Sequence, residues 1–231
     1  MFSAETTIQK YGPEKEVKLE DYETEIIEYV ESVEKMENSI GIGRTAEVFY
    51  SKTNPGMCFK IIHDKEFYQN DVIKEGHFLD KVEKIKSTVK TPRPYYALIN
   101  VKKDYHVLVM EKLNAFSVED LMEGREENLP AGFDRRKFIN ELKEFFQIMH
   151  EQKKIFHRDA HGGNIMIERE TGRPCVIDFG TAKESYISTE NPYIYVDAIG
   201  KGALYTDDLV RLDNIKKDLI NYIAEQKSLD K

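Results

Sequence analysis

Two short apolar runs separated by a turn signal constrain this 231-residue chain more than any other feature. The runs occupy residues 165–167 and 175–177, and residues 170–174 between them read Glu-Thr-Gly-Arg-Pro. Short apolar runs on either side of a turn containing glycine and proline are typical of a tight β-hairpin. The pattern therefore predicts a hairpin with three polar side chains near its open end: Asp159, Asn164 and Asp178.

The side chains at the open end of this hairpin suit a metal-bound nucleotide. Carboxylate and amide oxygens are hard ligands for Mg²⁺, which takes one or two of them together with phosphate oxygens and water. This part of the chain also resembles the catalytic and metal-binding loops of the protein kinases. The resemblance rests on His-Arg-Asp at 157–159, on Asn164 five residues after the Asp, and on Asp-Phe-Gly at 178–180. The resemblance implies a general base at Asp159, a cation at Arg158 that receives an activation-loop phosphate, and Mg²⁺ ligands at Asn164 and Asp178.

A second hairpin containing glycine is predicted upstream, at residues 40–62. It begins with Gly41, Ile42 and Gly43 and continues as an alternating run through Val48. Glycine has no Cβ, so backbone N–H groups beside it can approach phosphate oxygens closely. The hairpin resembles the glycine-rich loop of the kinases, except that an alanine replaces the third glycine. These residues are therefore expected to bind the nucleotide.

Lys60 lies in the strand predicted at residues 57–62. A single lysine in a strand, taken alone, indicates an exposed edge. After a glycine loop, however, it resembles the kinase lysine that binds the α- and β-phosphates. Such a lysine needs a carboxylate to orient it, and the helix predicted at residues 67–86 contains Glu75, with Glu66 as the alternative. We therefore expect Lys60 and Glu75 to form a catalytic pair.

The resemblance also implies an adenine-binding region. A hairpin is predicted at residues 96–110, and the chain after it resembles the hinge between the two kinase lobes. Met110 would lie at the back of the adenine pocket, and Glu111 and Leu113 would offer backbone hydrogen bonds to the base. Cys58 would lie over the adenine ring, where it is expected to react with thiol-reactive nucleotide analogues.

The resemblance implies an α+β, two-lobed protein kinase-like fold. The small lobe, an antiparallel sheet plus one helix, is expected at residues 39–111, and a shortened, mostly helical large lobe at residues 112–231. Residues 1–38 are acidic and are interpreted as an N-terminal extension with one short amphipathic helix around Ile26, a solvated leader, with packing of that helix on the body of the fold as the alternative.

Two helices are predicted in the large lobe from apolar periodicity, at residues 118–123 and 135–152, with Ser117 as the N-cap of the first. No Ala-Pro-Glu sequence closes an activation segment after the Asp-Phe-Gly run. Asp207 or Asp208 could brace the catalytic loop at the start of a last helix.

The composition excludes some function classes. The net charge of −8 argues against a general nucleic-acid binder, because phosphate contacts need clustered lysine and arginine. The two cysteines lie in apolar runs, which predicts two reduced, buried thiols. No apolar run reaches the length of a membrane span. We expect a monomer, with a partner protein that completes the large lobe as an alternative, located in the cytoplasm or secreted into the cytosol of a host cell.

His161 departs from the protein kinase pattern, which has a lysine two residues after the catalytic Asp159. The resulting Asp-x-His-x-x-Asn order resembles the aminoglycoside and choline phosphotransferases, and His161 is expected to hydrogen-bond the transferred phosphate. Those enzymes carry a large helical insert for which this chain has no room. We therefore expect an ATP- and Mg²⁺-dependent Ser/Thr protein kinase, similar to the minimal effector kinases that bacterial pathogens deliver into host cells. The alternatives are a small-molecule phosphotransferase, a partner-dependent ATPase and a binding module without chemistry.

Overall fold

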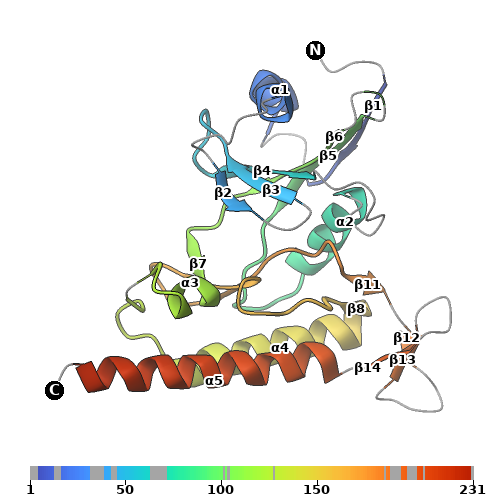
Figure 1. The fold of residues 1–231 in the computed structure, drawn as a ribbon. Coiled ribbons are helices and arrows are strands. Elements are labelled where there is room, and N and C mark those ends of the chain that lie inside the picture. The colour runs from blue at the N-terminus through green and yellow to red at the C-terminus, as the bar shows by residue number, and fades with distance from the viewer. Residues whose placement is uncertain are drawn as a thin grey trace. The chain divides into compact units, whose positions relative to one another are not determined.

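The computed structural model describes residues 5–12, 17–31, 39–42, 46–62, 72–100, 102, 105–126, 128–184, 186–187, 194–196, 202–204 and 206–229. The chain divides into two compact units (Figure 1). The first consists of Met1–Asp80 and Pro92–Leu113, and the second of Lys81–Thr91 and Asn114–Lys231. The first unit thus ends close to the lobe boundary predicted at residue 111, but it also includes the N-terminal residues.

The first unit is built on a six-stranded antiparallel sheet with the order β1-β5-β6-β4-β3-β2. Both hairpins predicted for this part of the chain are confirmed, since β3 pairs with β4 and β5 pairs with β6. The strands are β1 (Thr6–Lys10), β2 (Ser39–Ile42), β3 (Ala46–Tyr50), β4 (Met57–Ile62), β5 (Pro94–Asn100) and β6 (Tyr105–Glu111).

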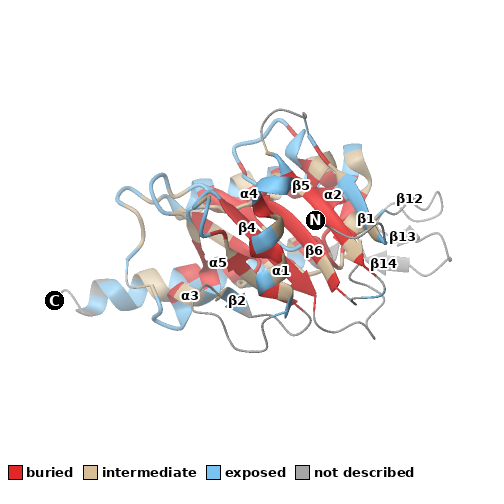
Figure 2. Ribbon diagram, turned by 90° about the horizontal axis from the view of Figure 1, so that it is seen from above, coloured by how far each residue is buried: buried red, intermediate tan, exposed pale blue. Residues whose placement is uncertain are grey.

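Helix α1 (Glu23–Glu31), preceded by the 3₁₀ turn η1 (Leu19–Tyr22), packs on one face of this sheet (Figures 1 and 2). Ile26 is fully buried, and the ring of Tyr29 stacks on Phe49 with 4.8 Å between the ring centroids. The buried carboxylate of Glu25 accepts hydrogen bonds from the hydroxyl of Ser51 at 2.8 Å and from the turn that follows it. The helix is therefore confirmed, whereas the prediction of a solvated leader is wrong for these residues.

A tyrosine after β1 also ties the N-terminal segment to helix α2 (Val72–Glu83). The hydroxyl of Tyr11 donates to the carbonyl of Ile73 at 2.6 Å. A Cβ built on Gly76 would lie 2.6 Å from the Tyr11 ring, so only glycine allows this approach. A glycine lowers the stability of a helix by about 1 kcal/mol relative to alanine. At position 76 the glycine allows the Tyr11 ring to pack against α2.

The second unit contains the remaining helices and three small sheets, β10-β9-β7, β11-β8 and β12-β13-β14. Helices α4 and α5 run side by side (Figure 1) and bury apolar stripes that include Phe145 and Leu219. The elements are β7 (Ala115–Ser117), α3 (Val118–Met122), α4 (Arg135–Lys153), β8 (Ile155–Phe156), β9 (Ile165–Glu168), β10 (Pro174–Val176), β11 (Lys183–Glu184), β12 (Tyr186–Ile187), β13 (Ile194–Val196), β14 (Gly202–Leu204) and α5 (Thr206–Leu229).

Several local predictions for this unit are confirmed. The hairpin predicted at residues 165–177 is β9–β10, with Cys175 opposite Met166. Ser117 caps α3 in a reciprocal arrangement with Asp120, since its hydroxyl accepts from the Asp120 backbone N–H at 2.9 Å. Asp134, which was not among these predictions, caps α4 through its side chain alone, which accepts from the backbone N–H groups of Arg136 and Lys137. Among the residues that the structure describes, no helix has the length and apolar character needed to cross a membrane.

Candidate active site

A buried ion pair lies on the sheet of the first unit. Lys60 on β4 and Glu75 on α2 are 6% and 2% exposed, and the Lys60 Nζ atom lies 2.9 Å from both carboxylate oxygens of Glu75. A buried ammonium is stable only with such a partner. The predicted pairing is confirmed, whereas Glu66, the alternative partner, lies outside the described residues.

Several predicted nucleotide-binding residues share one face of the sheet with Lys60. Val48 on β3 lies directly opposite Lys60, and Cys58 on β4 lies directly opposite Met110 on β6. Opposed residues in an antiparallel pair, and residues two apart in one strand, point to the same face. Val48, Cys58, Lys60 and Met110 therefore line one face, whereas Phe59 points to the opposite face, into the core beneath α1.

The glycine-containing strand, β2, pairs with β3 at the edge of the sheet. Gly41 on β2 is paired with Val48, and a Cβ built on it would meet no atom within 4 Å. The backbone of Ile42 continues the strand. Gly43 lies outside the described residues, so the structure places only the first half of the predicted loop.

The chain leaves β6 through the predicted hinge, where two backbone N–H groups already donate hydrogen bonds within the protein. The N–H of Glu111 donates to the carbonyl of Arg93 at 2.8 Å, and the N–H of Lys112 donates to the carbonyl of Gly56 at 2.8 Å. The Glu111 carbonyl lies 3.6 Å from the Cys58 Sγ atom. Leu113 ends the first unit and is partly exposed. Of the Glu111 backbone groups, the carbonyl is thus the one suited to bind a base.

The burial of Cys58 argues against the reactivity toward nucleotide analogues that the sequence suggested. Its side chain is buried, and desolvation raises its pKa to about 12, although the positive charge of Lys112 opposes the shift. Only the thiolate is nucleophilic, and a thiol with that pKa is about one part in 10⁴ ionised at pH 8. Both cysteines, Cys58 and Cys175, are free and buried as predicted.

We therefore expect a maleimide to leave both cysteines unmodified in the folded protein at pH 7.5 and to label both in 8 M urea (roughly the concentration that unfolds most small domains). Mass spectrometry of the two tryptic peptides measures this. Cys175 serves as the internal control, because it is also buried. Rapid labelling of the Cys58 peptide alone, without urea, would show that the sheet face opens to solvent.

The catalytic loop in the second unit is braced by Asp208, which lies in the first turn of α5. Its carboxylate accepts from the backbone N–H groups of His157 at 2.9 Å and Arg158 at 2.8 Å, and its Oδ2 atom lies 2.9 Å from Nε2 of His150. Burial alone would raise the pKa of Asp208, but these hydrogen bonds outweigh it and hold the pKa below its usual range. The bracing aspartate expected at 207 or 208 is therefore Asp208.

This brace supports an unusual backbone conformation. Arg158 has φ = 69° and Asp178 has φ = 59°, a region that costs a non-glycine residue about 1–2 kcal/mol. The two hydrogen bonds to Asp208 hold the backbone at residues 157 and 158 in place. The side chain of Arg158 is partly exposed. Strained residues supported in this way are typical of functional loops.

The ring of His157 joins the catalytic loop to the Asp-Phe-Gly segment. Its Nδ1 atom accepts from the Asp159 backbone N–H at 3.3 Å, and its Nε2 atom lies 2.8 Å from the Ile177 carbonyl. The ring packs edge-on against Phe179, with 4.7 Å between centroids. Asp159 and Asp178 are therefore positioned by one buried side chain, a role that the sequence pattern did not reveal.

Asp159, His161 and Asn164 form a tight group in the second unit. The amide nitrogen of Asn164 donates to the backbone carbonyl of Asp159 at 2.9 Å and lies 3.2 Å from Nε2 of His161. The Nδ1 atom of His161 accepts from the Gly163 N–H at 3.0 Å, which directs Nε2 toward the Asp159 Oδ2 atom, 3.7 Å away. The structure thus brings together three residues that the sequence singled out.

Arg211 completes this group, and the sequence reasoning missed it. Its Nη1 atom lies 3.1 Å from the Asp159 Oδ1 atom, although 52 positions separate the two residues. The signal that could have found it is its spacing on α5, since it follows Asp208 by three positions and such residues share a helix face.

Asn164 and Asp178 fit a Mg²⁺ ion by their chemistry. Because the Asn164 nitrogen is bonded to Asp159, its Oδ1 atom is the group suited to a cation. The Asp178 carboxylate is exposed and accepts from the Gly180 N–H at 3.2 Å. The described residues contain no cluster of three or more acidic, histidine or cysteine ligands. Two hard oxygen donors rather than a full cage suit Mg²⁺ that also binds phosphate.

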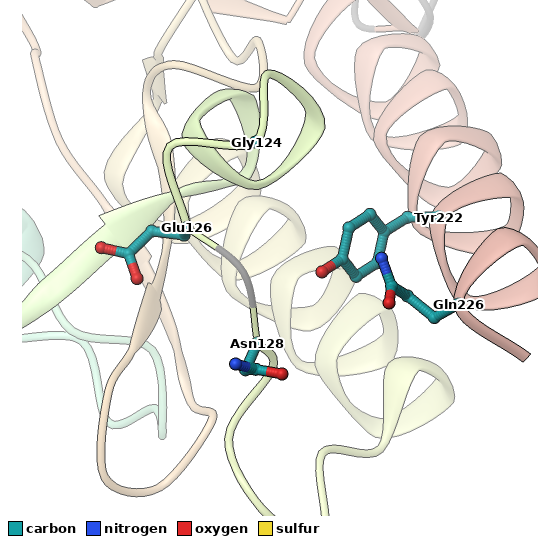
Figure 3. A pocket seen from close by; sticks show the side chains of 5 residues that line it. All are labelled: Gly124, Glu126, Asn128, Tyr222 and Gln226. Carbon is teal, nitrogen blue, oxygen red and sulfur yellow. The ribbon is translucent and has the colours of Figure 1, made fainter. Parts of the chain in front are cut away.

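A separate pocket of about 360 Å³ lies in the second unit between α5 and the loop after α3 (Figure 3). The described residues that line it include no lysine or arginine. Among them Glu126 is charged, and its ion pair with Arg169 lowers the pKa of Glu126. The pocket is lined by none of the candidate site residues, but by Gly124, Glu126, Asn128, Tyr222 and Gln226.

Comparison with known proteins supports the kinase resemblance. The family model described as "protein kinase domain" matches residues 34–200. The solved kinase domain of PknI from Mycobacterium tuberculosis is 17% identical, with a TM-score of 0.51, over 78% of this chain and 70% of that chain. A cysteine-to-alanine mutant of that domain gives 16% identity, the same TM-score and the same coverage. No curated protein matches this chain. The predicted α+β kinase-like fold, with an N-terminal antiparallel sheet and a helical C-terminal region, is confirmed.

Proposed function

Because the chain belongs to the protein kinase domain family, we propose that it is an ATP- and Mg²⁺-dependent kinase that phosphorylates serine or threonine in proteins. The observation that carries the proposal is the buried Lys60–Glu75 pair in one unit together with the contact between Asp159 and Asn164, and the exposed carboxylate of Asp178, in the other. Each unit thus contains side chains that phosphoryl transfer requires.

The first unit would hold the nucleotide. Lys60, oriented by both oxygens of Glu75, would bind the α- and β-phosphates, and the face that contains Val48, Cys58 and Met110 would contact the adenine ring. The side chains of Val48, Cys58 and Met110 are apolar, which favours a planar base. Gly41 and the backbone of the predicted loop would approach the phosphates.

The second unit would carry out the transfer. Asn164 Oδ1 and the Asp178 carboxylate would hold Mg²⁺, which when bound neutralises charge on the phosphates. The oxygen of the acceptor hydroxyl forms a bond to the γ-phosphorus, and the bond from that phosphorus to the β-phosphate oxygen breaks. ADP leaves with the electron pair, and Asp159 accepts the hydroxyl proton. His161 Nε2, beside Asp159, lies where it could donate to a phosphate oxygen.

The proposal is tested by incubating the protein with Mg²⁺ and γ-labelled ATP, alone and with a cell extract. We expect label on serine or threonine of protein bands, and loss of that label in Asp178→Ala. The matched control is Asp218→Ala, which removes an exposed carboxylate from α5 and is expected to change nothing.

Two outcomes would contradict the proposal. Equal labelling by Asp178→Ala would exclude the assigned metal ligand. Label that requires Asp178 but enters a small molecule instead of a protein would identify a small-molecule phosphotransferase, the alternative that the Asp-x-His-x-x-Asn order favours.

A further inference from the structure

One face of α5 contacts three consecutive residues of the catalytic loop. Asp208 accepts from the backbone N–H groups of His157 and Arg158, and Arg211 contacts the side chain of Asp159. Residues three apart on a helix lie on the same face, one turn along. The bonds that fix Asp208 against the loop therefore also place the Arg211 guanidinium at Asp159.

Folding stability does not explain the contact between Arg211 and Asp159. The two side chains are 42% and 39% exposed, and ion pairs this exposed to solvent contribute little to stability. Arginine is nevertheless suited to holding a carboxylate, because its charge is permanent and its planar group presents several donors in a fixed geometry.

The contact also distinguishes the two oxygens of the Asp159 carboxylate. Oδ1 is held by Arg211 at 3.1 Å, while Oδ2 faces Asn164 Nδ2 at 3.5 Å and His161 Nε2 at 3.7 Å. An aspartate carboxylate rotates over a broad range about its terminal torsion when nothing holds it. Arg211 restricts that rotation and keeps Oδ2 beside Asn164, the candidate metal ligand.

We propose that Arg211 is a positioning residue, which holds Oδ1 of Asp159 so that Oδ2 accepts the proton of the acceptor hydroxyl. This inference rests on the proposed kinase function and adds to it a residue on α5. Proton transfer depends steeply on the placement of the accepting oxygen, so an unheld carboxylate would slow the transfer step without weakening the binding of ATP.

The test compares the steady-state kinetics of wild type, Arg211→Gln and Arg211→Lys on the protein acceptor labelled by the wild type. We expect kcat to fall on the order of 10-fold in Arg211→Gln, with KM for ATP unchanged, because a misplaced catalytic group slows the reaction step. Arg211→Lys keeps one charged donor and is expected to recover part of kcat. The matched control is Lys217→Gln, which removes an exposed cation from the same helix and is expected to retain full activity.

The outcomes separate this inference from the proposed function. Wild-type transfer with an unchanged kcat in Arg211→Gln overturns the inference alone. A rise in kcat also overturns it, and would show that Arg211 blocks the carboxylate. A loss of kcat that Arg211→Lys does not relieve, together with a lowered thermal midpoint, would indicate a merely structural role. A wild type that binds Mg²⁺-ATP but transfers no phosphate overturns the proposed function, and the inference fails with it.

Discussion

Replacement of Asp159 by Asn is expected to lower the rate of phosphoryl transfer by about 10²- to 10⁴-fold, the usual contribution of a general base. The amide has the size of the carboxylate but cannot accept the hydroxyl proton. Because the side chain is 39% exposed, the fold should tolerate the change. Initial rates with γ-labelled ATP measure the loss.

Nucleotide binding should survive this substitution. The residues expected to hold ATP, above all Lys60 with Glu75, belong to the first unit, whereas Asp159 belongs to the second. Calorimetric titration with Mg²⁺-ATP is therefore expected to give a similar dissociation constant for Asp159→Asn and wild type. An exposed control, Asp218→Asn, should keep full activity. Full activity in Asp159→Asn would show that another group accepts the proton, and the assignment of roles would be wrong.

The second large effect is expected on stability. Replacing Asp208 by Ala should lower the free energy of unfolding by about 3–5 kcal/mol, because it leaves two buried backbone N–H groups and His150 without their acceptor. Urea denaturation measures this loss. Asp213→Ala, five positions further along the same helix at an exposed position, is the matched control and should cost less than about 1 kcal/mol.

The stability that Asp208 contributes should also depend on pH. Its pKa in the folded protein lies below the ordinary value of 3.8, since the hydrogen bonds outweigh burial. A carboxyl group with a lowered pKa stabilises the fold fully above its ordinary pKa, and this stabilisation is lost as the pH falls through the folded-state pKa. The difference in unfolding free energy between wild type and Asp208→Asn should therefore be constant from pH 5 to 7 and shrink below about pH 4. A difference that stays constant down to pH 2 would contradict the ionised, hydrogen-bonded state of Asp208.

Local patterns predicted most of the elements and part of the candidate site. The β9–β10 hairpin and the Ser117 cap are confirmed at the expected residues. These features depend on neighbours a few positions apart, namely turn residues, capping side chains and the two-residue period of a strand. The pairing of Lys60 with Glu75 followed from the resemblance to kinases and is confirmed by the geometry.

The contacts between distant segments were decided by the tertiary structure. The segment interpreted as a solvated leader forms the edge strand β1 on β5 and the helix α1, because Ile26 and Tyr29 complete a core that the sheet alone leaves open. Arg211 reaches Asp159 across 52 positions only because Asp208 anchors α5 to the catalytic loop. The sequence by itself thus determined which residue types suit phosphoryl transfer and where the confirmed hairpins and helices form. Which distant side chains meet depended on burial and hydrogen bonding between segments, which no local pattern records.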